Sequence, residues 1–193
     1  MNTQKIDYRN FFYPPGGIMI WILVMVELVT FGAALIALGF ISCEDPALYH
    51  ASRLKLNAAY GTVNTVVLLT SGYFMALAVH RSKQGAFRAA AKNILYALAG
   101  GGLFVVIKSV EYAEKLHHGL TVDYNTFFSF YWLLTLFHLI HVLVGMGLLA
   151  GMYFSLRKGT SEALVENTET VATFWHMVDL IWLMLFPTLY LIL

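Results

Sequence analysis

Five long apolar segments dominate this sequence, and they constrain its fold more than any other feature. They lie at about 17–41, 62–80, 93–110, 126–154 and 171–193. An α-helix of roughly 20 apolar residues spans a hydrocarbon layer of about 30 Å, and a soluble domain would not need several such runs. The composition of 59% hydrophobic and 12% charged residues agrees with lipid as the solvent. The sequence therefore predicts an all-α membrane protein, a bundle of five transmembrane helices.

The remaining residues form an N-terminal arm and short loops. Residues 1–16 are predicted to form the arm, and residues 17–193 a single five-helix transmembrane domain. The first apolar run is too long for a signal-peptide core, so we expect it to be retained as a helix. Because Lys and Arg of short loops stay on the cytoplasmic side, eight basic residues on the N-terminal side against four opposite predict a cytoplasmic N-terminus and an outer C-terminus. The eight are Lys5, Arg9, Arg81, Lys83, Arg88, Lys92, Arg157 and Lys158, and the four are Arg53, Lys55, Lys108 and Lys115.

Charge and cysteine content exclude other classes of protein. The net charge is +1 and no dense basic cluster occurs, so nucleic acid is not an expected partner. A single cysteine, Cys43, excludes an internal disulfide. No P-loop, nucleophile elbow, zinc-protease motif or flavin fingerprint is present, so the sequence predicts no catalytic residues.

Ionisable residues inside the apolar segments are the candidate site residues. Burying one in a bilayer costs at least a few kcal/mol, so each needs an explanation. Glu27 lies near the middle of the first span, with no cation one helical turn away. It is either a protonatable site or a carboxyl that hydrogen-bonds a neighbouring helix, and both interpretations place it against protein. Glu111 follows Lys108 by three residues, which predicts a local ion pair near the interface.

Two histidine motifs mark the last two spans. His138 and His141 are three residues apart, as are His176 and Asp179, so each pair shares one helical face. Two imidazoles at this spacing can supply two metal ligands. The alternative, which we favour, is that they hydrogen-bond between helices and that this chain binds no metal or cofactor.

Motifs in this order resemble subunit III of the haem-copper respiratory oxidases, over nearly all of the chain. Glu27-Leu28-Val29-Thr30-Phe31-Gly32 is similar to one helix of that family, and Asn64-Thr65 with Leu68 to Gly72 to the next. The other segments are Glu111-Tyr112-Ala113-Glu114, the paired-histidine helix Thr135 to Gly145, and Trp175-His176-Met177-Val178-Asp179. Longer members begin with two further helices that close a lipid cleft, which the five-helix form lacks.

The resemblance implies a non-catalytic subunit that packs on a catalytic, haem-bearing subunit and supports its stability and proton uptake. Haem and copper, or non-haem iron, are then expected in the partner, with lipid as a further ligand. The implied location is a bacterial-type inner membrane. The short form and Pro187 also resemble accessory proteins of nitric oxide reductase. The alternatives from other classes are an independent membrane metalloenzyme or cytochrome built on His138, His141 and His176, and a small proton channel using Glu27.

Overall fold

The computed structural model describes residues 14–159 and 162–192, and in these it is entirely helical. The helices are α1 (Ile18–Ser42), α2 (Pro46–Arg53), α3 (Ala58–Lys83), α4 (Phe87–His117), α5 (Thr126–Lys158), α6 (Glu162–Pro187) and the π-helix η1 (Thr188–Ile192). Five of these segments, with α6 and η1 forming one of them, are long and apolar enough to cross a membrane, which confirms the predicted all-α fold class. Most of the predicted arm, up to residue 13, lies outside the described residues.

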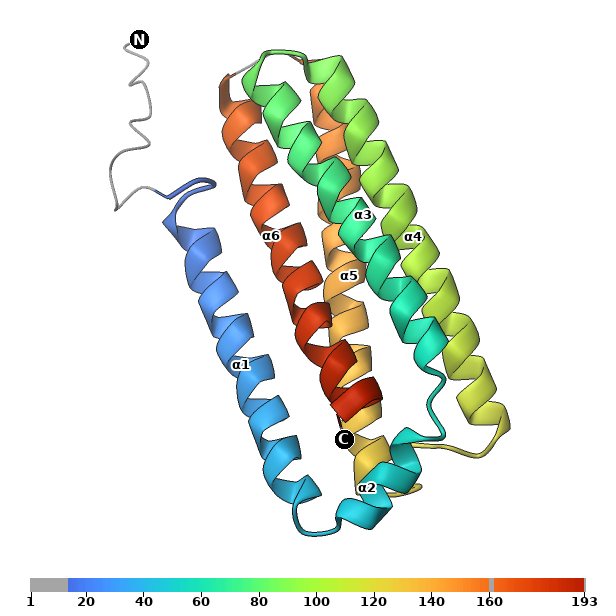
Figure 1. The fold of residues 1–193 in the computed structure, drawn as a ribbon. Coiled ribbons are helices and arrows are strands. Elements are labelled where there is room, and N and C mark those ends of the chain that lie inside the picture. Colours follow the sequence, from blue (N-terminus) through green and yellow to red (C-terminus); the bar gives the residue numbers. More distant parts are fainter. Residues whose placement is uncertain (1–13, 160–161, 193) are drawn as a thin grey trace.

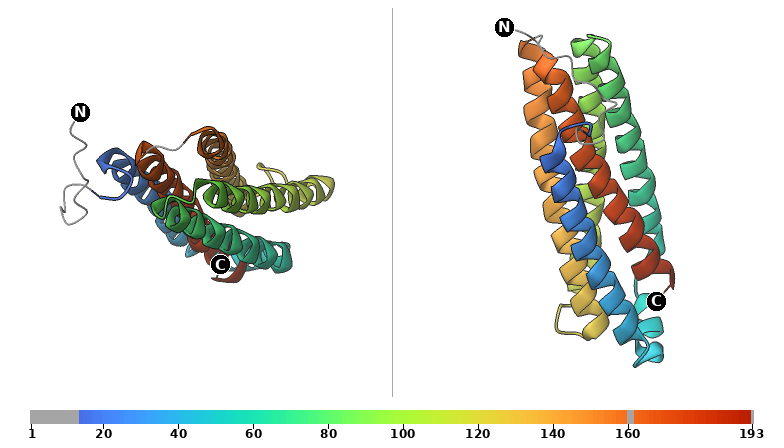
Figure 2. Two further views of the ribbon diagram at one scale, coloured as in Figure 1. Left: turned by 90° about the horizontal axis from the view of Figure 1, so that it is seen from above. Right: turned by 90° about the vertical axis from the view of Figure 1, so that its left-hand side faces the viewer.

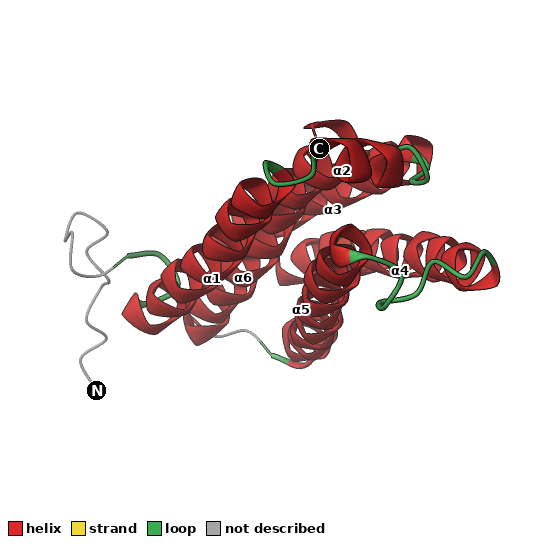
Figure 3. Cartoon of the chain, turned by 90° about the horizontal axis from the view of Figure 1, so that it is seen from below, coloured by secondary structure: helices red, strands yellow, loops and turns green. Residues whose placement is uncertain are grey.

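The five long helices form two layers (Figures 1 and 2). Seen from below, α1, α6 and α3 lie side by side in one layer, and α5 and α4 form the other (Figure 3). Helix α1 sits at the end of its layer and packs on α6 and α5. Only three α1 residues are buried, at seven-residue intervals, so a single narrow stripe of this helix faces the bundle: Val24, Phe31 and Leu38.

Helices α4 and α6 extend furthest beyond their apolar runs. The third run was expected to end at residue 110, but α4 continues to His117 and includes Glu111. The run expected from residue 171 begins at Glu162, and Pro187 closes α6. Proline lacks the N–H for an i→i−4 bond, and the chain continues after it in the wider π geometry of η1. Hydropathy locates the part of a helix that contacts lipid, and α4 continues beyond it because its polar residues find partners inside the protein.

Helix α2 is an element that the apolar pattern did not predict. Asp45 caps it by accepting a hydrogen bond from the Leu48 amide, and Pro46 occupies its first turn. It lies beneath the bundle, where Arg53 Nη1 donates to the carbonyl of Leu191 at 2.7 Å. Asn125, which caps α5 through the Phe128 amide, also donates to Ser52 Oγ at 2.8 Å. Helix α2 therefore ties the start of α5 to the C-terminal turn.

Small residues let the helices cross closely around Trp175. A Cβ at Gly101 of α4 or Gly145 of α5 would come within 2.8 Å of the Trp175 ring. The indole Nε1 donates to Ser71 Oγ at 3.0 Å, and Ser71 Oγ donates to the Ala97 carbonyl at 2.7 Å. One fully buried indole thus joins four helices, α3 to α6.

The basic residues bear on the predicted orientation. Lys108 and Lys115 had been counted with the outer loops, but both are buried within α4. Of the four basic residues that were counted on the side opposite the N-terminus, this leaves Arg53 and Lys55, both of which are described. The positive-inside count therefore favours a cytoplasmic N-terminus more strongly than the sequence alone indicated, and the orientation stays a prediction.

Candidate functional site

Glu27 of α1 faces His141 of α5 inside the membrane-spanning region. Its Oε1 lies 3.3 Å from His141 Nε2, and the two side chains are 15% and 13% exposed. His141 Nδ1 lies 2.8 Å from the Phe137 carbonyl, which only an N–H can bond, so Nδ1 carries a proton. Nε2 is the ring nitrogen that faces the Glu27 carboxyl, so the contact joins α1 to α5 through one carboxyl and one imidazole.

His138 occupies a different position from His141, although both lie on α5. Its ring is fully buried, stacks on Trp182 with centroids 5.3 Å apart, and meets Phe104 edge-on at 5.7 Å. Neither ring nitrogen has a hydrogen-bond partner in the described structure. Phe31 packs edge-on against both imidazoles. His141 therefore contacts a carboxyl group on α1, whereas His138 packs among aromatic rings.

A third polar group surrounds Lys108 and Glu111 and is fully buried. Lys108 Nζ donates to Glu111 Oε2 at 2.9 Å, to Tyr190 Oη at 2.7 Å and to Tyr131 Oη at 3.2 Å. Glu111 Oε1 accepts from both phenols, at 2.8 Å from Tyr131 and 2.6 Å from Tyr190, and Lys115 Nζ lies 3.9 Å from the same oxygen. The predicted ion pair is confirmed, but it lies inside the protein and joins α4, α5 and η1. We call these five residues the Lys108 cluster.

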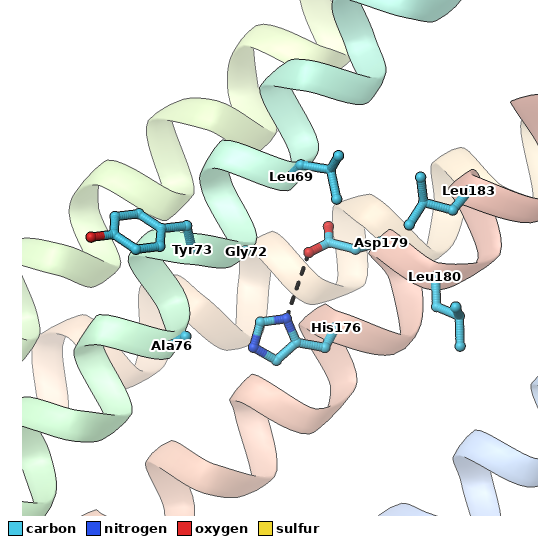
Figure 4. A pocket seen from close by; sticks show the side chains of 8 residues that line it. All are labelled: Leu69, Gly72, Tyr73, Ala76, His176, Asp179, Leu180 and Leu183. Atoms are coloured by element: carbon cyan, nitrogen blue, oxygen red, sulfur yellow. Dashed lines mark ion pairs between the residues drawn. The ribbon is translucent and has the colours of Figure 1, made fainter.

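His176 and Asp179 of α6 form the fourth group, in a groove beside α3 (Figure 4). His176 Nδ1 lies 3.7 Å from Asp179 Oδ2. Asp179 lies against Gly72 of α3, where a Cβ would collide with its carboxylate. The carboxylate is 8% exposed and its Oδ1 has no partner, whereas the His176 ring is 45% exposed at the mouth of the groove.

The six candidate residues are therefore distributed over separate places. The structure brings Glu27 to His141 and His176 to Asp179, places Glu111 in the Lys108 cluster, and leaves His138 among aromatic rings. In the described part of the chain, no three His, Cys, Asp or Glu side chains are grouped so that they could hold a metal ion. The metalloenzyme hypothesis needs such a ligand set, and the structure gives it no support.

The sequence interpretation missed Lys115, Tyr131 and Tyr190. Lys108, Glu111 and Lys115 follow a 3-then-4 spacing that puts all three on one helical face, and this signal was available. Tyr131 and Tyr190 lie 20 and 79 residues away from Glu111, so only the packing of α5 and η1 on α4 reveals them.

Comparisons with known proteins agree with this geometry. A family model described as cytochrome c oxidase subunit III matches residues 57–192. The chain is 30% identical over 140 residues to a cytochrome c oxidase subunit 3 of Corynebacterium diphtheriae, covering 71% of this chain and 67% of that one. It is 27% identical to a probable cytochrome c oxidase subunit 3 of Nocardia farcinica, over 90% and 85% of the two chains. A heme-copper oxidase subunit I+III of Aeropyrum pernix is 25% identical over 89% of this chain and 22% of its own length.

Proposed function

This chain belongs to the cytochrome c oxidase subunit III family, and on that premise we propose that it packs on the catalytic subunit of a haem-copper oxidase and supports its stability and proton uptake. Haem and copper are then held by the partner and not by this chain. The proposed location is the inner membrane of a bacterial-type cell. The observation that carries the proposal is the family match over residues 57–192.

Two further observations favour the role of a non-catalytic subunit over that of a catalytic one. The Aeropyrum pernix relative is named for subunits I and III together, so in that protein the two subunits are one chain. In the present chain the intramembrane polar groups of Glu27–His141 and of the Lys108 cluster bond mainly to one another. They serve helix packing, which is the common use of polar residues in membrane helices.

Glu27 is the residue through which we propose that the chain influences proton uptake. The contact places the Glu27 carboxyl 3.3 Å from His141 Nε2 at mid-membrane depth, and both side chains remain partly exposed. Histidine commonly takes part in proton transfer, so a carboxyl in contact with one is a suitable group for this role. This role needs no cofactor.

The test is purification of the tagged chain from its own membranes in a mild detergent. We expect a haem-bearing partner to co-purify, and the separated chain to show no haem absorption and no stoichiometric metal. A chain that purifies alone would contradict the proposal, and haem or metal bound to the isolated chain would favour the metalloenzyme alternative. Measuring both oxygen and nitric oxide consumption by the complex tests the nitric oxide reductase alternative.

The role of Glu27 has its own test in the complex. Glu27→Gln keeps the shape of the side chain and removes its acidic proton. We expect normal haem content, slower proton uptake and faster loss of activity during turnover, with Glu44→Gln in an exposed loop as the matched control. Equal behaviour of the two variants would remove Glu27 from the proposal. Proton flux through liposomes containing the chain alone, lost in Glu27→Gln, would support the channel alternative.

A further inference from the structure

The groove between α3 and α6 is the part of the surface that is least suited to lipid. It is an open hollow of about 380 Å³, lined by residues of α3 and α6. Leu69, Tyr73, Leu180 and Leu183 form its apolar walls, and His176 and Asp179 lie between them (Figure 4). Nothing in the described chain covers it.

The depth of the polar pair excludes a lipid headgroup as its partner. His176 and Asp179 flank the middle of the membrane-spanning segment Ala163–Ile192, and Gly72 lies near the middle of Ala58–Lys83. Headgroups begin about 15 Å from the centre of a hydrocarbon layer roughly 30 Å thick. Acyl chains at the centre offer no hydrogen bond, so a half-exposed imidazole beside a carboxylate oxygen without a partner is costly there.

The shape of the groove favours another transmembrane helix over a small molecule. The groove is open along one side, so it does not enclose a ligand as small-molecule sites do. The α3 side of the groove is lined by the small residues Gly72 and Ala76. Small residues allow the backbone of a second helix to approach closely. The exposed Tyr73 and Leu183 then lie where they would flank such a helix.

Other outward faces of the bundle lack this combination. Leu133, Ile140 and Leu143 on the exposed face of α5 are apolar and need no partner other than lipid. The Lys108 cluster is buried and bonded internally. Glu27 has His141 as its partner. The groove is where an ionisable pair at mid-membrane depth is presented outward.

We propose that the α3–α6 groove is the surface on which a transmembrane helix of the catalytic subunit docks, and that this helix presents a hydrogen-bonding side chain to the His176–Asp179 pair. The inference rests on the proposed function for the existence of that subunit, and adds which face of this chain meets it. The imidazole at the mouth is the contact group, and Asp179 orients it from behind.

Photo-crosslinking within the complex tests which face is covered. p-Benzoylphenylalanine replaces Tyr73, which is 61% exposed on the groove wall, and in a control Leu143, which is 50% exposed on α5 in the other layer. We expect the Tyr73 position to crosslink to the haem-bearing subunit and the Leu143 position to give at least tenfold less of that product. Mass spectrometry of the adduct identifies what was captured.

Substitutions in the groove test its energetic contribution. Ala76→Trp fills the groove from an exposed position, and Ala99→Trp places the same bulk on an exposed position of α4. We expect Ala76→Trp to reduce co-purification of the partner at least tenfold and Ala99→Trp to leave it unchanged. His176→Phe removes the contact group and should reduce co-purification about tenfold, since a buried hydrogen bond contributes up to about 1.5 kcal/mol and 1.4 kcal/mol corresponds to a factor of ten. The thermal midpoint of each isolated variant shows that it is folded.

The outcomes separate the inference from the proposed function. If the partner co-purifies but crosslinks from Leu143 and not from Tyr73, the docking face is wrong and the function stands. A quinone or lipid adduct at Tyr73 in the intact complex also overturns the inference, because the groove is then a ligand site. If no haem-bearing protein co-purifies with the unmodified chain, both fail.

Discussion

Replacing Lys108 by methionine measures how much this side chain contributes to the stability of the folded protein. Methionine fills a similar volume but removes three hydrogen-bond donors from the centre of the group. Removing one partner of a buried ion pair costs about 3–5 kcal/mol, because the other charge stays buried without compensation. Glu111 keeps two phenol donors, and Lys115 at 3.9 Å supplies a second cation. We therefore expect a loss at the lower end, about 3 kcal/mol.

The loss is measured as a thermal shift of the purified protein in mild detergent, followed by tryptophan fluorescence. For a chain of 150–250 residues, 1 kcal/mol shifts the midpoint by about 2–4 °C, so the expected decrease is roughly 6–12 °C. Lys92→Met, at an exposed position of the same helix, is the control and should cost less than about 0.5 kcal/mol.

A double variant decides whether charge compensation is the cause. Lys108→Met with Glu111→Met removes both charges of the ion pair, leaves Lys115 with the attraction of Glu114, and leaves two phenols whose oxygens are 3.5 Å apart and can bond each other. Because replacing a whole buried pair by apolar residues is often neutral, we expect the double variant to be at least as stable as either single one. Losses that add, so that the double variant is less stable than both, would refute the reasoning.

Three further predictions concern the helix contacts. Gly145→Ala forces a Cβ to within 2.8 Å of Trp175 and should cost about 1–3 kcal/mol by thermal unfolding, whereas Gly147→Ala on the open side of α5 should cost almost nothing; equal effects would show that Trp175 moves freely. Glu27→Ala and His141→Ala should show a coupling energy of about 0.6–1.7 kcal/mol in a double-mutant cycle, the range measured for hydrogen bonds between membrane helices, and independence would mean that their contact is not formed. Asn125→Ala should cost more than Asn57→Ala, since both lose an N-cap of about 1 kcal/mol but Asn125 also loses its bond to Ser52; similar losses would contradict the tie between α2 and α5.

The fold class was predictable from the sequence because the solvent dictates it. Five apolar runs must become five helices in lipid, since every backbone N–H and C=O there needs an internal partner. The ends of α4 were not predictable from hydropathy, which treats Lys108 and Glu111 as a polar boundary. Once the two charges bond to each other and to phenols, the helix carries them inside the protein and continues to His117.

Five of the six candidate residues are buried or nearly buried and His176 is exposed, but the partners of these residues could not be predicted from the sequence. Glu27 and His141 are 114 residues apart in the chain, and no local pattern links them. His138 and His141 share a helical face by spacing, yet Trp182 lies beside the first and Glu27 beside the second. Partner identity depends on how the helices are rotated against one another, and this is decided by close contacts such as Gly101 and Gly145 on Trp175.

The three ionisable groups inside the membrane-spanning region differ in how many of their polar atoms lack a partner within this chain. The Lys108 cluster gives Lys108 three acceptors and both carboxylate oxygens of Glu111 a donor, so it contributes to the fold alone. The Glu27–His141 pair joins α1 to the bundle and keeps one carboxylate oxygen, Oε2, without a partner. The His176–Asp179 pair joins no two helices by a hydrogen bond of its own and points its imidazole outward. Since an unsatisfied ionisable pair at mid-membrane depth is destabilising unless something covers it, the groove is the place where this chain depends most on a second protein.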